Sequence, residues 1–257
     1  MDNAQDKSKL KFGLVGRDIS YSFSRGYFAD KFDKENLPYS YVNFDLQSID
    51  ELKAITENTS ALTGLNVTIP YKEQVIPLLD KLNKEAEKIG AVNTIRITKK
   101  GKLIGYNTDF YGFKNSIEPH LKPHHKKALI LGTGGASKAI AYALKKLNIQ
   151  FDFVSRSHKK GVTFLYSDLT ENIISDYTII INCTPIGTFP KVDDCPDIPY
   201  SALTENHILY DLIYNPEQTK FLKNGFQRGA TTINGLEMLR LQAEKSWEIW
   251  FNIKLDI

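Results

Sequence analysis

The feature that most constrains the fold is a glycine-rich turn, Gly132 to Ser137, that joins an apolar run to a helix-like segment. The run before it, Ala128 to Leu131, has the length of a buried strand, and apolar residues recur at helical spacing after it. In a strand–turn–helix unit of this kind, Gly132 permits the tight turn and Gly134 lets the backbone approach a pyrophosphate. The amides at the start of the helix attract the same anion. The sequence therefore predicts a dinucleotide-binding site.

The residues after the next strand indicate which dinucleotide. This strand, Phe151 to Val154, is followed by Ser155, Arg156, Ser157, His158, Lys159 and Lys160. NAD-binding units carry an acidic residue here for the ribose 2′-hydroxyl, and Asp152 stands two residues too early for that role. Arg156 has a planar guanidinium that suits a phosphate and can stack on adenine, and Lys160 follows closely. We therefore expect NADP.

Composition limits the remaining possibilities. A chain of 257 residues with 42% hydrophobic and 25% charged residues can form two modest cores, so we expect two domains. The net charge of +3 is scattered, which argues against a nucleic-acid surface. The chain lacks an apolar signal core and a run of about 18 to 20 apolar residues, so no membrane span is expected. Cys183 and Cys195 lack metal or redox spacing, which fits a cytoplasmic protein.

Polar residues gather where the strands of the first half end. Alternating strand and helix patterns from Phe12 onward predict a mostly parallel sheet, and open sheets of this kind bind ligands at the carboxyl ends of their strands. The end of one strand, Gly64 to Ile69, carries Asn66 and Thr68, with Lys72 just past the next proline, and Asp109 follows another strand. A lysine after a proline is more often solvated than catalytic, and an aspartate before a helix is usually an N-cap.

Ser22 and Ser24 stand at the start of an expected helix, Ser22 to Glu35. N-capping is the ordinary role of serine at this position. The functional alternative is that two hydroxyls and the free amides hold a carboxylate.

The segment Glu118 to Lys127 is expected to link the two domains. The final helix is expected to bury one apolar face, with Gln242 off that face. The residues of this face are Leu236, Leu239, Ala243, Trp247 and Trp250.

Taken together and in order, these motifs resemble one family, the shikimate dehydrogenases. The resemblance extends from residue 13 to about residue 243. The motifs are Ser22 to Ser24, Asn66 to Lys72, Ala91 to Thr94, Gly105 to Asp109, Gly132 to Ser137, Ser155 to Ser157, Asn182 to Gly187, Tyr210 to Tyr214 and Asn234 to Gln242. Any one of them is weak, whereas the ordered set is specific.

The resemblance implies an α/β fold with two domains and a returning helix. These are a substrate-binding domain (1–117) with an open, mostly parallel sheet, an NADP-binding Rossmann domain (118–234) and a C-terminal helix (235–257). It implies Lys72 and Asp109 as the catalytic pair. It implies a substrate shell of Ser22, Ser24, Asn66, Thr68, Asn93, Asp109, Tyr214 and Gln242. It implies a cofactor site of Gly132, Thr133, Gly134, Gly135, Ala136, Ser155, Arg156, Ser157, Lys160, Thr184, Leu212 and Gly235, with no metal.

Two departures from the family pattern concern these sites. Tyr21 and Arg25 flank the paired serines, where the family usually has His and Pro, so the shape of that loop is open. Ser155 and Ser157 flank Arg156, where Asn and Thr are common.

The implied reaction is the reversible, NADP-dependent reduction of 3-dehydroshikimate to shikimate, a small-molecule substrate of chorismate and aromatic amino-acid biosynthesis. A cytoplasmic monomer or homodimer is expected. Two alternatives stay open: a dual-specificity quinate/shikimate dehydrogenase, and a non-catalytic NADP-sensing module on the same fold. The presence of both Lys72 and Asp109 argues against the second alternative.

Overall fold

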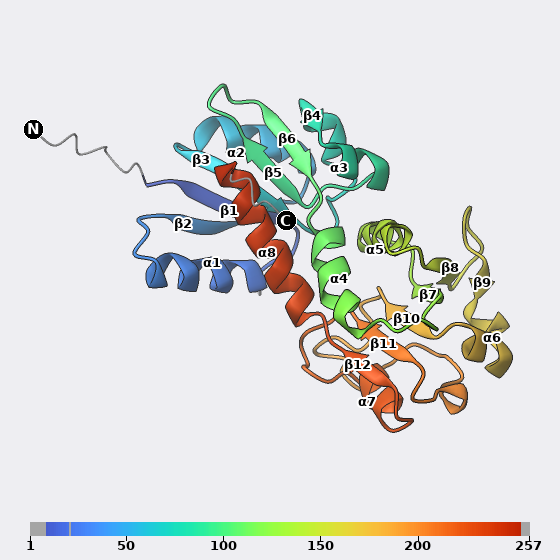
Figure 1. Cartoon of the computed structure of the whole chain (residues 1–257). Helices are drawn as coiled ribbons and strands as arrows, with labels where there is room; N and C mark the ends of the chain where they lie inside the picture. The colour runs from blue at the N-terminus through green and yellow to red at the C-terminus, as the bar shows by residue number, and fades with distance from the viewer. Residues whose placement is uncertain (1–8, 21, 253–257) are drawn as a thin grey trace, which may run out of the picture. The chain divides into compact units, whose positions relative to one another are not determined.

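The computed structural model describes residues 9–20 and 22–252 and divides into two compact units (Figure 1). The first unit takes in the chain up to Thr108 and resumes at Ala243, and the second extends from Asp109 to Gln242. The chain thus passes between the units at Asp109 and again inside the last helix.

The first unit is built on a six-stranded sheet within the described residues, in the order β2-β1-β3-β5-β6-β4. Its strands are β1 Lys11–Gly16, β2 Ser40–Asp45, β3 Leu62–Val67, β4 Lys81–Leu82, β5 Thr94–Ile97 and β6 Leu103–Tyr106. β1 pairs in parallel with β2 and β3, and β4 pairs in parallel with β6. β5 is antiparallel to both of its neighbours, because a tight turn after Ile97 leads directly into β6.

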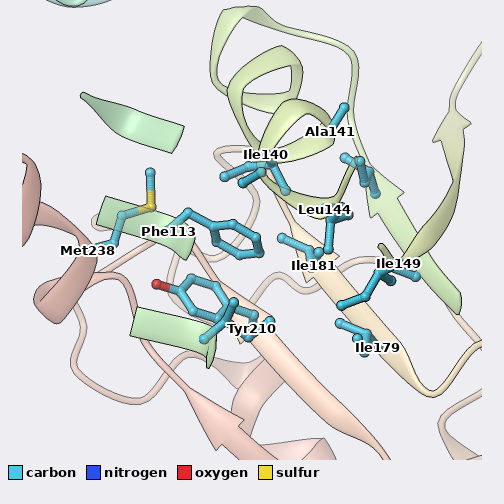
Figure 2. Packing of buried hydrophobic residues seen from close by; sticks show 13 residues of the cluster. Phe113, Ile140, Ala141, Leu144, Ile149, Ile179, Ile181, Tyr210 and Met238 are labelled. Carbon is cyan, nitrogen blue, oxygen red and sulfur yellow. The ribbon is translucent and has the colours of Figure 1, made fainter. Parts of the chain in front are cut away.

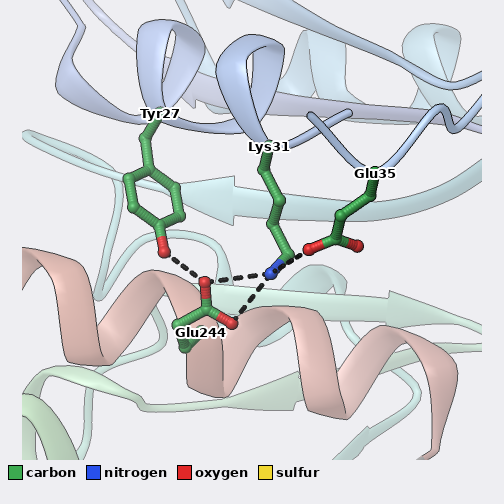
Figure 3. A network of polar contacts seen from close by, with 4 residues as sticks. All are labelled: Tyr27, Lys31, Glu35 and Glu244. Carbon is green, nitrogen blue, oxygen red and sulfur yellow. Dashed lines mark hydrogen bonds and ion pairs between the residues drawn. The ribbon is translucent and has the colours of Figure 1, made fainter. Parts of the chain in front are cut away.

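The helices of the first unit are α1 Phe23–Lys34, α2 Leu52–Asn58, α3 Lys84–Ile89 and the last part of α8 Leu236–Phe251. A polar network joins α1 to α8 (Figure 3). The Lys31 ammonium lies 2.9 Å from a Glu35 carboxylate oxygen and 3.1 Å from each Glu244 oxygen, and Tyr27 also donates to Glu244. Around this network, α8 buries Ala243 and Trp250 against aromatic residues of β1, β2 and α1. Helix α1, which follows Ser22 and carries Ser24, is therefore fixed on two sides.

The second unit contains a six-stranded sheet, within the described residues, in the order β12-β11-β10-β7-β8-β9. Its strands are β7 Lys127–Leu131, β8 Gln150–Ser155, β9 Phe164–Leu165, β10 Ile179–Asn182, β11 Ile208–Asp211 and β12 Thr231–Ile233. Each pair is parallel. The strand order reverses between β7 and β10, which is the switch point where Rossmann sheets bind dinucleotides.

The helices of the second unit are α4 Asp109–Ile117, α5 Gly135–Lys146, α6 Glu171–Asp176, α7 Lys220–Phe226 and the start of α8. Figure 2 shows the core on the α5 face of the sheet, where Ile140 and Leu144 share a cluster with Ile179 and Ile181. A second cluster covers the opposite face. Because both faces are buried, β7 and β10 are continuous apolar runs rather than alternating ones.

The final helix differs in two respects from its expected apolar face, at Leu236 and at Gln242, which was expected off that face and is buried. Leu236 is 46% exposed, whereas Met238 is buried in the second unit and Gln242 is 7% exposed. Leu236 is the first residue of α8, so its side chain leans over the turn before the helix rather than over the core. The placement of Leu236 on the buried face was therefore wrong.

Candidate active site

Within the first unit, predicted substrate residues belong to one buried polar cluster. We define this cluster as Ser24, Tyr41, Asn66, Asn93, Thr94, Thr108 and Ser246. The Tyr41 hydroxyl donates to Asn66 Oδ1 over 2.8 Å, and Asn66 Nδ2 donates to Ser246 Oγ over 2.9 Å. Burial raises the pKa of Tyr41, and a hydrogen bond with Ser24 opposes that rise. Ser24 and Asn66 are thereby connected through one tyrosine.

Asn93 extends the cluster toward the end of β6. Its Nδ2 lies 3.0 Å from Thr108 Oγ1, and its Oδ1 accepts the Thr108 backbone N–H over 2.6 Å. Thr94 Oγ1 lies 2.8 Å from Ser246 Oγ. These bonds fix the backbone of Thr108, the residue immediately before Asp109.

The two candidate serines have different surroundings. Ser22 is the N-cap of α1, and its Oγ accepts the Arg25 N–H over 3.3 Å, as the capping interpretation predicts. An accepting hydroxyl keeps its own proton, so capping leaves Ser22 able to donate to an anion. Ser24 is 9% exposed, whereas Arg25 is exposed. Tyr21, the other departure from the family pattern, lies outside the described residues.

Thr68 and Lys72 lie in the loop that follows β3. The Thr68 N–H donates to the Val15 carbonyl over 2.9 Å, and the Lys72 carbonyl accepts the Val92 N–H over 2.7 Å. Both residues are half-buried, whereas Ile69 between them is 74% exposed. Since Val67 N–H donates to the Asn93 carbonyl, this loop and the segment before β5 lie side by side at the end of β3.

Asp109, Tyr214 and Gln242 belong to the second unit. Asp109 is the first residue of α4 and is 5% exposed. One turn later, a Cβ at Gly112 would lie 2.5 Å from the Met238 carbonyl and 3.2 Å from Gln242 Cβ, so α4 and α8 are in close contact there. Burial raises the pKa of the half-buried Tyr214.

The glycine turn has the backbone that a dinucleotide site requires. Gly132 has φ +105°, and a Cβ there would lie 3.0 Å from Thr184 Cγ2. Gly134 is the N-cap of α5, and a Cβ there would meet no atom within 4 Å. Ser137 Oγ donates to the Gly134 carbonyl over 2.6 Å, which holds the turn. The first turn of α5 has no acidic residue, so nothing on that turn opposes an anion at its free amides.

The end of β8 fits a phosphate better than a ribose hydroxyl. Arg156, Ser157 and Lys160 are exposed, and Ser155 is 7% exposed. Asp152, the acidic residue near the expected distance, accepts a hydrogen bond from Tyr177 over 2.7 Å and another from Thr163. Its carboxylate is therefore used inside the protein, and the residues present fit NADP.

The remaining cofactor candidates follow β10 and β11. Thr184 N–H and Oγ1 both donate to Asn182 Oδ1, over 3.0 and 2.6 Å. Asn182 Nδ2 in turn donates to Asp211 over 3.0 Å. Burial raises the pKa of Asp211 to about 6, although hydrogen bonds from Thr219, Ile213 and Asn182 oppose the rise. A Cβ at Gly235 would lie 2.1 Å from the Leu212 carbonyl oxygen, so only glycine fits there.

Sequence reasoning missed several residues that hold these candidates in place. Tyr41, Ser246 and Asp211 form the hydrogen bonds just described, yet none was a candidate. Asp211 lies in the family motif Tyr210 to Tyr214, so its place in that motif could have marked it as a candidate. Ser246 lies on a helix far along the chain and gave none.

No helix among the described residues combines the length and apolar character needed to cross a membrane. In the same residues, no group of three or more His, Cys, Asp and Glu side chains is placed to hold a metal ion.

A Rossmann-type sheet with a glycine turn after its first strand, in a chain that also forms a second α/β unit, is typical of the class of two-domain nucleotide-dependent dehydrogenases. Residues 14–95 match the family model described as the shikimate dehydrogenase substrate binding domain. A shikimate dehydrogenase (NADP(+)) of Methanosphaera stadtmanae is 40% identical over 93% of this chain and 90% of its own length. The chain therefore belongs to the shikimate dehydrogenase family.

Solved structures agree with this assignment. A shikimate dehydrogenase crystallised in complex with NADP+ is 34% identical, with a TM-score of 0.84, and covers 99% of this chain and 93% of its own. A quinate dehydrogenase from Corynebacterium glutamicum in complex with NAD is 26% identical, also with a TM-score of 0.84, over 96% of this chain and 95% of its own. Both substrate preferences thus occur on closely similar folds.

Proposed function

We propose that the protein reversibly reduces 3-dehydroshikimate to shikimate with NADPH, in the cytoplasm, as a monomer or homodimer. The observation that carries the proposal is similarity over nearly the whole chain to relatives named shikimate dehydrogenase (NADP(+)). The NADP preference is supported separately by Arg156 at the end of β8 and by the internal bonds of Asp152. In this proposal residues 1–117 bind substrate, residues 118–234 bind NADP and the helix from 235 returns to the first domain.

Bound NADPH supplies the hydride that reduces the substrate ketone. Negative charge develops on the carbonyl oxygen as the ketone is reduced, and the Lys72 ammonium stabilises that charge and donates the proton. In the reverse direction the neutral amine accepts the proton. Asp109 binds a ring hydroxyl of the substrate and holds Lys72 in position.

The substrate carboxylate is held by hydroxyls at the start of α1. Ser22 donates from the hydroxyl whose oxygen already caps the helix, and the helix dipole adds to the attraction. Ser24 is kept in place by Tyr41. The other binding groups are Asn66, Thr68, Asn93, Tyr214 and Gln242. The cofactor is held by the turn from Gly132 to Ala136, by Ser155 to Lys160, and by Thr184, Leu212 and Gly235.

The test is reduction of 3-dehydroshikimate by the purified protein with NADPH and with NADH, and oxidation of shikimate and of quinate with NADP. We expect the highest kcat/KM for shikimate with NADP. An equal or higher value for quinate would favour dual specificity, and no turnover with any pair would favour a non-catalytic module.

The role of Lys72 is tested by Lys72→Met, which keeps the length of the stem and removes the proton and charge. Loss of general acid catalysis lowers kcat by about 10² to 10⁴, with little change in KM for shikimate. The matched control is Lys53→Met, because the Lys53 side chain is 80% exposed on α2 and its ion pair with Glu57 is long, at 3.9 Å. Near-normal turnover in Lys72→Met with much weaker shikimate binding would make Lys72 a binding residue.

A further inference from the structure

The hydroxyl of Tyr166 is enclosed and unpaired. Tyr166 begins the short 3-10 turn Tyr166–Asp168 directly after β9, and its ring packs against the apolar cluster on the face opposite α5. Its Oη is buried and has no hydrogen-bond partner among the described residues. A buried hydroxyl without a partner destabilises the folded protein, so such a group calls for a reason.

The position of Tyr166 gives a reason for its unpaired hydroxyl. β8 and β9 are parallel, with Val154 opposite Phe164 and Ser155 opposite Leu165. Arg156 and Tyr166 are therefore the first residues after two adjacent strands, at the carboxyl edge where a Rossmann sheet binds its cofactor. The positive charge of Arg156 reaches the phenol, since it opposes the effect of burial, which raises the pKa of Tyr166 to about 12.

The phenol is also linked to the residues beside the glycine turn by an electrostatic interaction. Cys183, which follows β10, interacts electrostatically with Tyr166, and the backbone of Cys183 lies 3.4 Å from the Cβ position of Gly132. Since β7 and β8 stand between β9 and β10, the tyrosine side chain must extend inward from the edge strand, over the ends of those two strands.

The connection before Tyr166 keeps this edge open. Residues 156–163 join two parallel strands with no helix, where such crossovers usually take a dozen or more residues and include one. The segment from Arg156 to Lys160 is exposed. This edge of the sheet therefore has room to rearrange around a bound anion.

We infer that Tyr166 donates a hydrogen bond from Oη to the 2′-phosphate of NADP, beside Arg156, and that it contributes to the preference for NADP over NAD. The inference rests on the proposed use of NADP. A neutral phenol is a hydrogen-bond donor at physiological pH, and an ionised phosphate oxygen makes the bond stronger than a ribose hydroxyl would.

The test compares Tyr166→Phe with the wild-type protein by calorimetric binding of 2′,5′-ADP and of 5′-ADP, which differ only in the 2′-phosphate. We expect about tenfold weaker binding of 2′,5′-ADP and unchanged binding of 5′-ADP, because a hydrogen bond to a charged group is lost. The melting temperature of the free protein should hold or rise, since the unpaired hydroxyl is removed. Tyr177→Phe is the matched control: its hydroxyl bonds Asp152 over 2.7 Å, so it should destabilise the fold and leave the ratio of the two affinities unchanged.

Each outcome of this test supports or overturns the assignment of Tyr166 to the 2′-phosphate. Affinity for 2′,5′-ADP within twofold of wild type, or equal weakening of both nucleotides, overturns the assignment to the 2′-phosphate. If the wild-type protein binds 5′-ADP as tightly as 2′,5′-ADP, the proposed use of NADP is wrong. This outcome is distinct from a failure of the role proposed for Tyr166. Should Tyr166→Phe not fold, the ring ¹³Cζ resonances of labelled wild-type protein give the answer. One tyrosine resonance must shift with 2′,5′-ADP and not with 5′-ADP, and no such shift refutes the contact.

Discussion

Two glycines of the same turn should respond in opposite ways to alanine. At Gly132, φ is +105° and the new Cβ would lie 3.0 Å from Thr184 Cγ2. Backbone strain of about 1–2 kcal/mol and overpacking of about 1–3 kcal/mol give Gly132→Ala a loss of about 2–5 kcal/mol in the free energy of unfolding. At Gly134, φ is −82° and no atom lies within 4 Å of the Cβ position. Alanine is a poorer N-cap than glycine, which lowers the stability, and it makes the unfolded chain less flexible, which raises the stability. Because the two effects nearly cancel, Gly134→Ala should change the free energy of unfolding by less than about 1 kcal/mol.

Cofactor binding should show the reverse order of effects. The open space at Gly134 is where we expect the backbone to approach the pyrophosphate, so an added methyl should weaken NADP binding by about 10- to 100-fold, the equivalent of about 1–3 kcal/mol. Thermal unfolding measures the first effect, at about 2–4 °C per kcal/mol, and isothermal titration with NADP measures the second. Normal NADP affinity in Gly134→Ala, or destabilisation equal to that of Gly132→Ala, would refute the reasoning.

Three further perturbations follow from the structure. Arg156→Ala should raise KM for NADP and leave that for NAD nearly unchanged, and equal losses with both in steady-state kinetics would remove Arg156 from the phosphate site. Ser22→Ala should lower the free energy of unfolding by about 1 kcal/mol because the helix cap is lost. Ser22→Ala and Ser24→Ala should each weaken shikimate binding by about 1–2 kcal/mol. Unchanged shikimate affinity in both variants would leave capping and packing as the only roles of these serines. Burial lowers the pKa of His125 below 6.5, so the unfolded chain binds a proton that the folded one does not, and the free energy of unfolding should fall as pH drops below about 6.5. Urea titrations should show that dependence reduced in His125→Asn.

The second unit could be predicted well from sequence because its signals are local. Buried parallel strands are continuous apolar runs, and β7 contains the run Ala128 to Leu131 that predicted it. The order of strands follows from right-handed crossovers once the glycine turn fixes the first strand. β9 was missed, since a two-residue edge strand leaves too little pattern to detect.

The buried polar cluster of the first unit could not be predicted in the same way. Its hydrogen bonds connect residues as far apart as Asn66 and Ser246, and a serine in the middle of an amphipathic helix is ordinarily a surface residue. Spacing along the chain contains no information about which helix returns to which strand. Ser22, Ser24 and Asn66 were candidates because of their places at a helix start and at a strand end, and Asn93 because of a family motif. Such signals mark positions without giving the contacts that support them.

Those supporting contacts change how a lost activity should be interpreted. Asn66 accepts from Tyr41 and donates to Ser246, so Asn66→Ala would remove the acceptor of the buried Tyr41 phenol. The Ser246 hydroxyl would lose one bond and keep its contact with Thr94 Oγ1. A buried donor without an acceptor costs about 1–3 kcal/mol, which is as large as the value of one substrate hydrogen bond. Substitution of Asn66 would therefore impair the fold of the first unit before it reported on binding. Ser22, which is partly exposed and bonded only to a backbone N–H among the contacts identified, reports on the substrate more directly.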